Sequence, residues 1–318
     1  MIPFPSIHHL KDVPINMRYV SSDLPASLRF VGTVKLHGTH ADVVVNREGI
    51  VTFQSRNRII TPGDDNCGFA TAMIRRAALF AKLAEKGDTV FAGEWCGRGV
   101  QSGVGIAALD RFFVIYAVRE LDTGQERWLD VPTTSLSTNL LAELNAARVF
   151  FIDQFPRFEV TVARDDVLAS VTVAEVDRLT LAVERECPVA RYFGVVGGVG
   201  EGIVWKCADA PTSRMWFKSK GPLHAVVRPA KIAKGPTDDN TFALSFVDAC
   251  VPEARFRQGL DHLREYGLDA STSNMGAFIK WVCDDAIKEE GSDLTPLQAK
   301  AVRKLIAQRG SKFYCAQK

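Results

Sequence analysis

The first two thirds of the chain alternate hydrophobic and polar positions in the way that β-strands do. Short apolar runs are bounded by glycine and polar residues, which is typical of strands joined by turns. Strands are expected at residues 30–37, 41–46, 50–55, 89–95, 111–118, 158–162, 201–207 and 214–220. Residues 46–49 indicate a hairpin turn, which places Lys35 and Arg56 at neighbouring strand ends.

Between these strands, three segments carry apolar residues at helical spacing. They cover residues 67–85, 134–147 and 173–186. Thr172 with Glu175 three residues later forms the pattern of a capping box for the third helix. The first 30 residues contain several prolines and are expected to wrap the surface as an irregular segment.

The pattern changes near Pro222. Pro222 and Pro229 mark a boundary, and after residue 239 the apolar spacing is helical throughout. Helices are expected at residues 241–251, 253–266, 274–290 and 296–308. The chain is therefore predicted to be α+β, with a mixed domain at residues 1–222 and a small all-α domain at residues 223–318.

Composition narrows the class of protein without deciding its function. The 318 residues are 47% hydrophobic, enough to bury a substantial core, and the net charge of +2 gives no bulk attraction for a polyanion. Seven cysteines without a Cys-x-x-Cys pair argue against a zinc site and for reduced thiols. No signal-peptide pattern and no apolar run of about 18 residues is found, so a soluble cytoplasmic protein is expected.

Six short clusters of chemically capable residues follow one another along the predicted strand ends. Taken singly, each has a structural explanation, since a lysine beside a turn is mostly a solvated charge and an aromatic run is mostly core. The clusters are Lys35-Leu-His-Gly38, Ser55-Arg-Asn-Arg58, Gly93-Glu-Trp-Cys-Gly97 with Gln101, Phe112-Phe-Val-Ile-Tyr116, Glu201-Gly-Ile-Val-Trp-Lys206 and Phe217-Lys-Ser-Lys220. Their number and order are far more specific than any one of them.

Together these clusters resemble those of the covalent nucleotidyltransferase superfamily of polynucleotide ligases and capping enzymes. The form Lys-x-His-Gly-Thr at Lys35 is similar to the RNA ligase 2 family of ATP-dependent RNA ligases, because DNA ligases and capping enzymes usually carry aspartate where His37 stands. The resemblance implies a nucleotidyltransferase domain, an ATP-grasp-like ligase fold of antiparallel sheets with flanking helices. It covers residues 35–220, and the helical domain is expected to bind RNA ends.

The resemblance implies that Lys35 is the nucleophile that forms a lysyl-AMP intermediate with ATP. A lysine amine with a pKa near 10 must lose a proton first, and nearby cations with partial burial favour the free base. Lys218, Lys220 and a bound metal ion are expected to supply those cations. Alternation along the strand sends both lysines to one face, and in the family both contact the α-phosphate of ATP.

The remaining site residues are also taken from the resemblance. Glu201 is expected near a divalent metal, Mg²⁺ or Mn²⁺, and Glu94 at the ribose hydroxyls. Lys206 is expected at the phosphates, and His37 is expected to orient pyrophosphate or an RNA phosphate.

Three positions remain open at this stage. Arg56 matches the arginine that binds ribose or RNA phosphate, with Arg58 as the alternative if the register shifts by a turn. Phe113 is aligned with the aromatic residue that stacks on adenine, although Phe112 is one residue away on the opposite face. At His40 the family commonly has asparagine, so no role is assigned.

The sequence thus predicts an ATP-dependent RNA ligase, a monomer that joins 5′-phosphate and 3′-hydroxyl RNA ends in RNA repair. Whether the substrate is a nicked duplex, a single-stranded break or a tRNA is left open by the sequence. A DNA ligase or guanylyltransferase of the same superfamily is the nearest alternative, and the helical tail argues against it because those enzymes usually append a small β-barrel. A non-catalytic RNA-binding protein is the alternative of another class. The absence of a Gly-x-x-x-x-Gly-Lys-[Ser/Thr] loop excludes a P-loop kinase domain.

Overall fold

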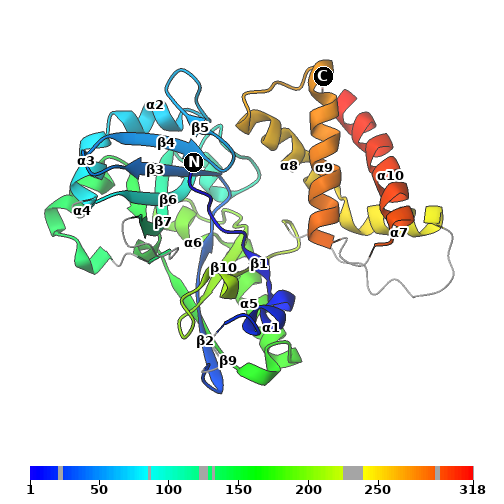
Figure 1. The fold of residues 1–318 in the computed structure, drawn as a ribbon, viewed down its shortest axis with the longest axis horizontal. Helices are drawn as coiled ribbons and strands as arrows, with labels where there is room; N and C mark the ends of the chain where they lie inside the picture. Colours follow the sequence, from blue (N-terminus) through cyan, green and yellow to red (C-terminus); the bar gives the residue numbers. More distant parts are fainter. Residues whose placement is uncertain are drawn as a thin grey trace. The chain divides into compact units, whose positions relative to one another are not determined.

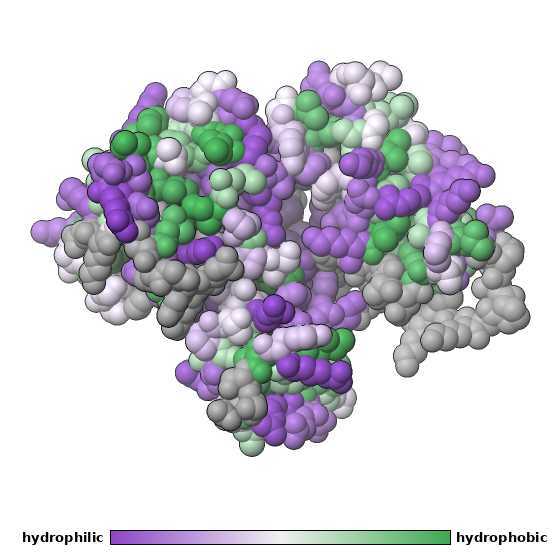
Figure 2. All heavy atoms as spheres, viewed as in Figure 1, coloured by the Kyte–Doolittle hydropathy of each residue, from purple (hydrophilic) through white to green (hydrophobic). Residues whose placement is uncertain are grey.

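The computed structural model describes residues 1–20, 24–84, 87–121, 128–130, 133–224, 239–290 and 294–317. The chain divides into two compact units, Met1–Leu223 and His224–Lys318. The first unit mixes strands and helices and the second contains helices (Figure 1), so the α+β class is confirmed. None of the described helices is both long and apolar enough to span a membrane. Figure 2 shows hydrophilic and hydrophobic residues interspersed over the exposed face of each unit.

Two sheets organise the first unit. The first sheet has five strands in the order β1-β11-β10-β2-β9, and the second has six in the order β5-β4-β3-β6-β7-β8. The first sheet is made of His8–His9 (β1), Phe217–Lys220 (β11), Gly202–Cys207 (β10), Ser27–Lys35 (β2) and Arg157–Ala163 (β9). The second is made of Ile59–Ile60 (β5), Val51–Ser55 (β4), Thr39–Val45 (β3), Thr89–Cys96 (β6), Phe112–Glu120 (β7) and Val149–Phe151 (β8).

Most strand pairs are antiparallel, as expected, but each sheet also has one parallel pair. The short strand β1 runs parallel to β11, and β8 runs parallel to β7. In both cases one partner is a strand of three residues or fewer at a sheet edge. The segment before residue 30 is therefore not irregular. It contains β1, the helix Val13–Met17 (α1) and the start of β2.

Helices cover the faces of both sheets. Ser170–Arg185 (α5) packs on β9, β10 and β11, where the hydroxyls of Thr180 and Ser219 lie 2.7 Å apart. The second sheet packs its apolar face against three helices, with Phe69, Phe80 and Leu144 in the shared core. These helices are Phe69–Ile74 (α2), Ala77–Leu83 (α3) and Thr138–Ala146 (α4).

Two helix predictions were wrong in detail. The segment 67–85 forms two helices rather than one, with a break at Arg75 and Arg76. The capping box at Thr172 does not form, because the helix begins earlier, at Ser170, and Glu175 lies inside it. There Glu175 pairs with Arg178 one turn later, at 2.7 Å.

The second unit is a bundle of four described α-helices: Asp239–Cys250 (α7), Glu253–Glu265 (α8), Met275–Glu290 (α9) and Pro296–Cys315 (α10). Its core includes the buried side chains of Phe246, Phe278, Val302 and Ile306. Gly259 lets α8 approach α9 closely, since a Cβ there would lie 2.7 Å from Val282 and 2.8 Å from the ring of Phe278. This unit therefore has a hydrophobic core of its own.

Candidate active site

The register of the first sheet brings two lysines to one position. Strand β10 lies between β2 and β11, and Gly202 stands opposite Lys35 on one side and Lys220 on the other. A Cβ at position 202 would lie 2.0 Å from the carbonyl oxygen of Ser219, so the close pairing with β11 requires glycine. Glu201, the residue before it, therefore lies between the two lysine side chains.

Glu201 is the centre of the resulting ion cluster. Its carboxylate oxygen Oε2 lies 2.7 Å from Lys35 Nζ, and its Oε1 lies 2.9 Å from Lys220 Nζ. His37 Nδ1 is 3.4 Å from Oε2. Only 3% of the Glu201 side chain is exposed, so the carboxylate meets ammonium groups rather than water. Four residues singled out from the sequence are thus brought together.

Lys218 belongs to the same face of the sheet. It stands opposite Val204, two residues along β11 from Lys220, and Val204 lines the cavity beside Lys35. Because side chains two residues apart in a strand share a face, Lys218 and Lys220 both lie on the cavity side of β11. On the other face, Phe217 and Ser219 pack toward the core and α5.

The ion cluster shifts the pKa values of both partners. Burial acts to raise the pKa of Glu201, but Lys220 and Lys35 outweigh it and hold that pKa well below its usual value. Burial acts to lower the pKa of Lys35, but Glu201 and Glu94 outweigh it and raise that pKa. The expectation that cations lower the pKa of Lys35 was therefore wrong for the ligand-free protein, in which the amine is held as an ammonium ion.

Glu94 fixes the turn that follows Lys35. Its Oε1 accepts a hydrogen bond of 3.1 Å from the backbone N–H of Gly38, and the Gln101 amide donates to the Gly38 carbonyl at 3.3 Å. A Cβ at position 38 would lie 2.2 Å from the carbonyl oxygen of Trp95, so this turn also requires glycine. Burial raises the pKa of Glu94 to about 7, against the opposing charges of Lys35 and His40.

A cavity opens beside Lys35 between the two sheets. It is lined by apolar and aromatic side chains together with Lys35, Glu94 and Lys206. Its volume is about 80 Å³, well below the roughly 300 Å³ at which pockets for small ligands begin. Phe4 and Ile7, from the N-terminal segment, form part of its wall. The cavity in this form is therefore too small for a nucleotide.

The prediction that Phe113 stacks on a base is not supported by its position. Phe113 is fully buried and packs on Phe69 in the core of the second sheet, with ring centroids 4.9 Å apart. Phe112 is equally buried on the opposite face, 5.2 Å from Phe193. Both faces of β7 are covered at that point. The aromatic residue of this strand that lines the cavity is Tyr116.

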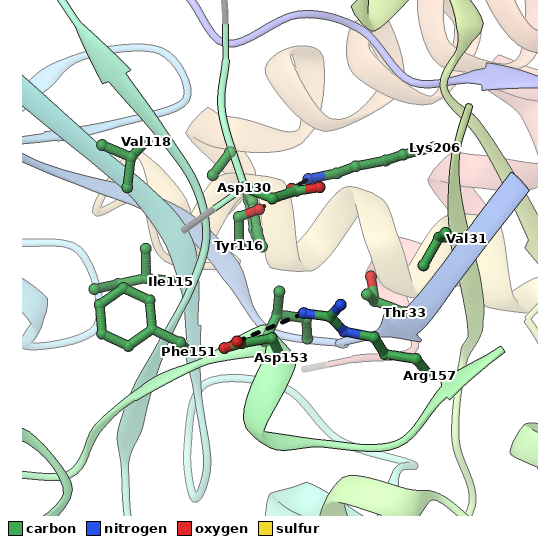
Figure 3. A pocket seen from close by; sticks show the side chains of 12 residues that line it. Val31, Thr33, Ile115, Tyr116, Val118, Asp130, Phe151, Asp153, Arg157 and Lys206 are labelled. Carbon is green, nitrogen blue, oxygen red and sulfur yellow. Dashed lines mark hydrogen bonds and ion pairs between the residues drawn. The ribbon is translucent and has the colours of Figure 1, made fainter. Parts of the chain in front are cut away.

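Lys206, which was expected at the phosphates, is bound to protein groups in this structure. Its ammonium group donates to the Tyr116 carbonyl at 2.9 Å, pairs with Asp130 and lies 4.6 Å from the ring centre of Trp216. Figure 3 shows Lys206 and Asp130 facing each other beside Tyr116, with the pair Asp153 and Arg157 on the other side of a second, smaller cavity. That cavity shares Thr33, Tyr116, Ile152 and Lys206 with the first, so the two cavities adjoin.

Arg56 lies at the outer wall of the site. Its guanidinium group is 5.9 Å from the ring centre of Phe4 and donates to the Pro5 carbonyl at 3.5 Å, so it holds the N-terminal segment in place. Arg58 is used elsewhere, because it pairs with Asp64 at 2.7 Å and donates to the Asp65 carbonyl at 2.8 Å. The alternative that put Arg58 in the site is therefore not supported.

His40 is part of a buried hydrogen-bond chain that the sequence did not indicate. Its Nδ1 lies 2.5 Å from the Tyr116 hydroxyl and its Nε2 lies 3.1 Å from the carboxylate of Asp42. Gln54 donates to Asp42 at 2.7 Å and to the Ile2 carbonyl at 2.6 Å, and the Ile2 N–H donates back to Gln54 at 2.9 Å. The N-terminal segment is thus tied through the second sheet to Tyr116.

The segment that contains the ion cluster matches a known protein family. The family model described as RNA ligase matches residues 28–220, more than half of the chain. The chain therefore belongs to the RNA ligase family, in the nucleotidyltransferase superfamily. No curated protein matches it.

Solved structures of a Naegleria gruberi RNA ligase are among those similar to the chain. A lysine mutant with ATP and Mn has 15% identity and a TM-score of 0.47, and a second lysine mutant with AMP and Mn has 16% identity and a TM-score of 0.47. A further mutant without ligand has 16% identity and a TM-score of 0.48. Each alignment covers 70% of this chain, which spans 57% of the Naegleria chain.

The raised pKa of Glu94 predicts a pH-dependent loss of stability. The pKa of Glu94 in the folded protein, about 7, lies above the usual 4.5. Its contribution to the free energy of unfolding is therefore complete below pH 4.5 and is lost as the pH rises through 7. Compared with Glu94→Gln, the wild type should lose at most about 3 kcal/mol of unfolding free energy over that range. Denaturant unfolding at a series of pH values measures this difference. The prediction would be contradicted if the unfolding free energies of wild type and Glu94→Gln changed with pH in parallel. Glu48→Gln, at an exposed position, serves as the control.

Proposed function

We propose that this protein is an ATP-dependent RNA ligase. Lys35 attacks the α-phosphorus of ATP, a phosphorus–nitrogen bond forms, and pyrophosphate leaves, which gives lysyl-AMP. AMP then passes to the 5′-phosphate of an RNA, and the 3′-hydroxyl of a second end displaces AMP to form the phosphodiester bond. The single observation that carries the proposal is the cluster of Lys35, Glu201 and Lys220 at the edge of a cavity, in a chain of the RNA ligase family.

The lysines of the first sheet are suited to hold the phosphates of ATP. Lys220 is paired with Glu201 in the absence of nucleotide, and Lys218 lies on the same face. A phosphate group that enters beside them exchanges the carboxylate partner of Lys220 for phosphate oxygens. The two ammonium groups then neutralise charge that builds up on the transferring phosphoryl group, which is the main task of a protein in such reactions.

Deprotonation of Lys35 is the step that this site must control. Glu201 and Glu94 hold the amine as an ammonium ion, so a resting protein carries no reactive nucleophile at neutral pH. Glu201 would attract the Lys35 proton less strongly once its carboxylate held a cation, and the pKa of the amine would then fall. Adenylylation is therefore coupled to the arrival of the nucleotide with its counter-ion.

The residues around Lys35 fit a metal ion that arrives with ATP rather than a resident one. Within the described part of the chain no group of three or more His, Cys, Asp or Glu side chains could hold a metal. Glu201 offers one carboxylate, and Mg²⁺ is typically bound by one or two carboxylates together with substrate phosphates and water. Bound Mg²⁺ or Mn²⁺ would neutralise phosphate charge, and Mn accompanies ATP or AMP in the Naegleria structures.

The nucleoside part of ATP fits the cavity once the N-terminal wall moves. Tyr116 takes the place proposed earlier for Phe113 and offers a ring for the adenine, with Val204 on the opposite sheet. Glu94 lies between this cavity and the turn after Lys35, which suits a hydrogen bond to a ribose hydroxyl. Because the movable wall contains Phe4, the widening of the pocket involves the segment held by Arg56 and Gln54.

The alternatives are less well supported. A non-catalytic RNA-binding protein has no need for a buried carboxylate between two lysines, which is costly to desolvate. A DNA ligase or guanylyltransferase is disfavoured by the helical second unit, where those enzymes usually carry a β-barrel, and by His37. No two of the seven cysteines form a disulfide, which fits action in a reducing cytoplasm.

The nucleophile is tested by covalent labelling. With magnesium and labelled nucleotide, ATP but not GTP should label the full-length protein, and Lys35→Ala should stay unlabelled. Lys35→Arg should also fail, because a guanidinium group stays protonated and cannot attack. Acid-stability and alkali-stability of the label identify a phosphoramidate, and Lys82→Ala, an exposed lysine outside the site, is the matched control. Label on the Lys35→Ala protein would exclude this assignment.

The role of Glu201 is tested by Glu201→Gln. Removal of the charge should lower the pKa of Lys35, which alone would make the amine more reactive at neutral pH. If Glu201 also supports the metal and the transition-state charge, adenylylation and sealing should both slow by about a hundredfold or more. Single-turnover rates across a magnesium titration give the answer. Rates equal to or above those of the wild type would show that Glu201 only keeps the Lys35 amine protonated and does not support the metal or the transition state.

The division of labour between the two units is tested by truncation after Leu223. The first unit holds the complete ion cluster and its own core, so it should still form lysyl-AMP. It should fail to seal a 5′-phosphorylated nicked duplex if the helical unit holds the RNA through phosphate contacts. Transfer of label to the nick and sealing are measured together. Sealing as fast as the full-length protein would remove the helical unit from RNA binding.

A further inference from the structure

The helical unit contains an open pocket between α8 and α9 that the proposed ligase mechanism does not use. Its volume is about 400 Å³, within the range of small-ligand pockets. His262 lines it from α8 and Tyr266 from the residue after α8, and Lys280, Trp281 and Lys288 line it from α9. The pocket is therefore large enough, as it stands, for a planar ligand with a charged group attached.

Aromatic rings form one continuous row along this pocket. The ring of His262 is stacked on Trp281, with centroids 5.1 Å apart and an interplanar angle of 22°. The ring of Tyr266 lies 4.8 Å from that of His262 and is tilted against it by 58°, so only His262 and Trp281 are stacked. Burial lowers the pKa of His262, which favours the uncharged imidazole. Such a row is extended most naturally by another flat ring, and nucleobases are flat rings that stack on aromatic side chains regardless of sequence.

The charges at the rim favour an anion next to that ring. The two acidic residues of the pocket are neutralised, since Asp284 pairs with Arg303 at 2.7 Å and Asp285 pairs with Arg255 at 3.1 Å. Lys280 and Lys288 make no ion pair with any side chain that the structure describes. They lie eight residues apart on one face of α9, about 12 Å along the helix, which is farther than one phosphate group can bridge.

We propose that this pocket binds an unpaired nucleotide of an RNA strand, with the base stacked on the row of Trp281 and His262 and successive phosphates at Lys280 and Lys288. The identity of the strand as RNA rests on the proposed ligase function. The aromatic row supplies a contact that a fully paired duplex cannot use, because its bases are already stacked within the helix. An unpaired strand end or a single-stranded overhang is therefore the substrate feature that this unit recognises.

The test compares the binding of fluorescent RNAs to the full-length protein. A single-stranded oligonucleotide should bind more tightly than the same sequence as a blunt duplex. Trp281→Ala should weaken binding of the single strand by about tenfold, as expected for one lost base stack, while Trp281→Phe should keep most of it. The double variant Lys280→Ala with Lys288→Ala should also bind weakly and show a smaller dependence on salt. Lys312→Ala, an exposed lysine on α10, should change binding by about twofold at most.

Two outcomes of these binding measurements would overturn the proposal. Equal binding of the single strand by Trp281→Ala and wild type would overturn it. The proposal would also be overturned if AMP displaced the RNA at concentrations as low as those at which the RNA itself binds, because the pocket would then take a free nucleotide. The helical content and the thermal unfolding of each variant, followed by circular dichroism, should match those of the wild type, which shows that the helical unit is folded. Adenylylation of Lys35 should also be unchanged, because the variants lie outside the first unit. Loss of adenylylation in the wild type would refute the proposed function, whereas the binding comparison would still stand on its own.

Discussion

The carboxylate of Glu201, held between the ammonium groups of Lys35 and Lys220, is the interaction on which the rest of the first unit depends. The Glu201 side chain is only 3% exposed, so removal of a lysine partner would leave an uncompensated buried charge. The cluster forms only if β2, β10 and β11 pair in one register. Glycine at position 202 makes that register possible because no side chain fits there.

The ligand-free protein is closed in two independent senses. Chemically, Lys35 stays an ammonium ion despite its burial, because Glu201 and Glu94 outweigh the effect of burial and raise its pKa. Sterically, the cavity beside it is too small for a nucleotide, and its wall contains Phe4 from a segment that is hydrogen-bonded to Gln54. On the proposed mechanism, the entry of a nucleotide with its metal ion would remove both barriers. On the proposed mechanism, that coupling would keep the nucleophile from reacting until the substrate is in place.

Much of this arrangement could be predicted from the sequence, and the exceptions have physical causes. Strand periodicity located Lys35, Glu201 and Lys220 at strand ends, and the structure brings them together. Phe113 was misplaced because alternation tells which face a side chain takes but not what covers that face. The contributions of Phe4 and Gln54 depend on contacts between residues about 50 positions apart, to which no local pattern points. The capping box at Thr172 failed because tertiary packing sets where α5 begins.

The central claim is that Glu201 keeps Lys35 protonated until a nucleotide arrives, and the pKa of Lys35 is its most direct test. Reductive methylation with a ¹³C label makes the amine visible by NMR, and comparison with Lys35→Arg assigns its signal. The account predicts a pKa above that of an ordinary lysine in the free protein, and a lower one after addition of magnesium with a non-hydrolysable ATP analogue. A pKa at or below the ordinary value in the free protein would contradict it.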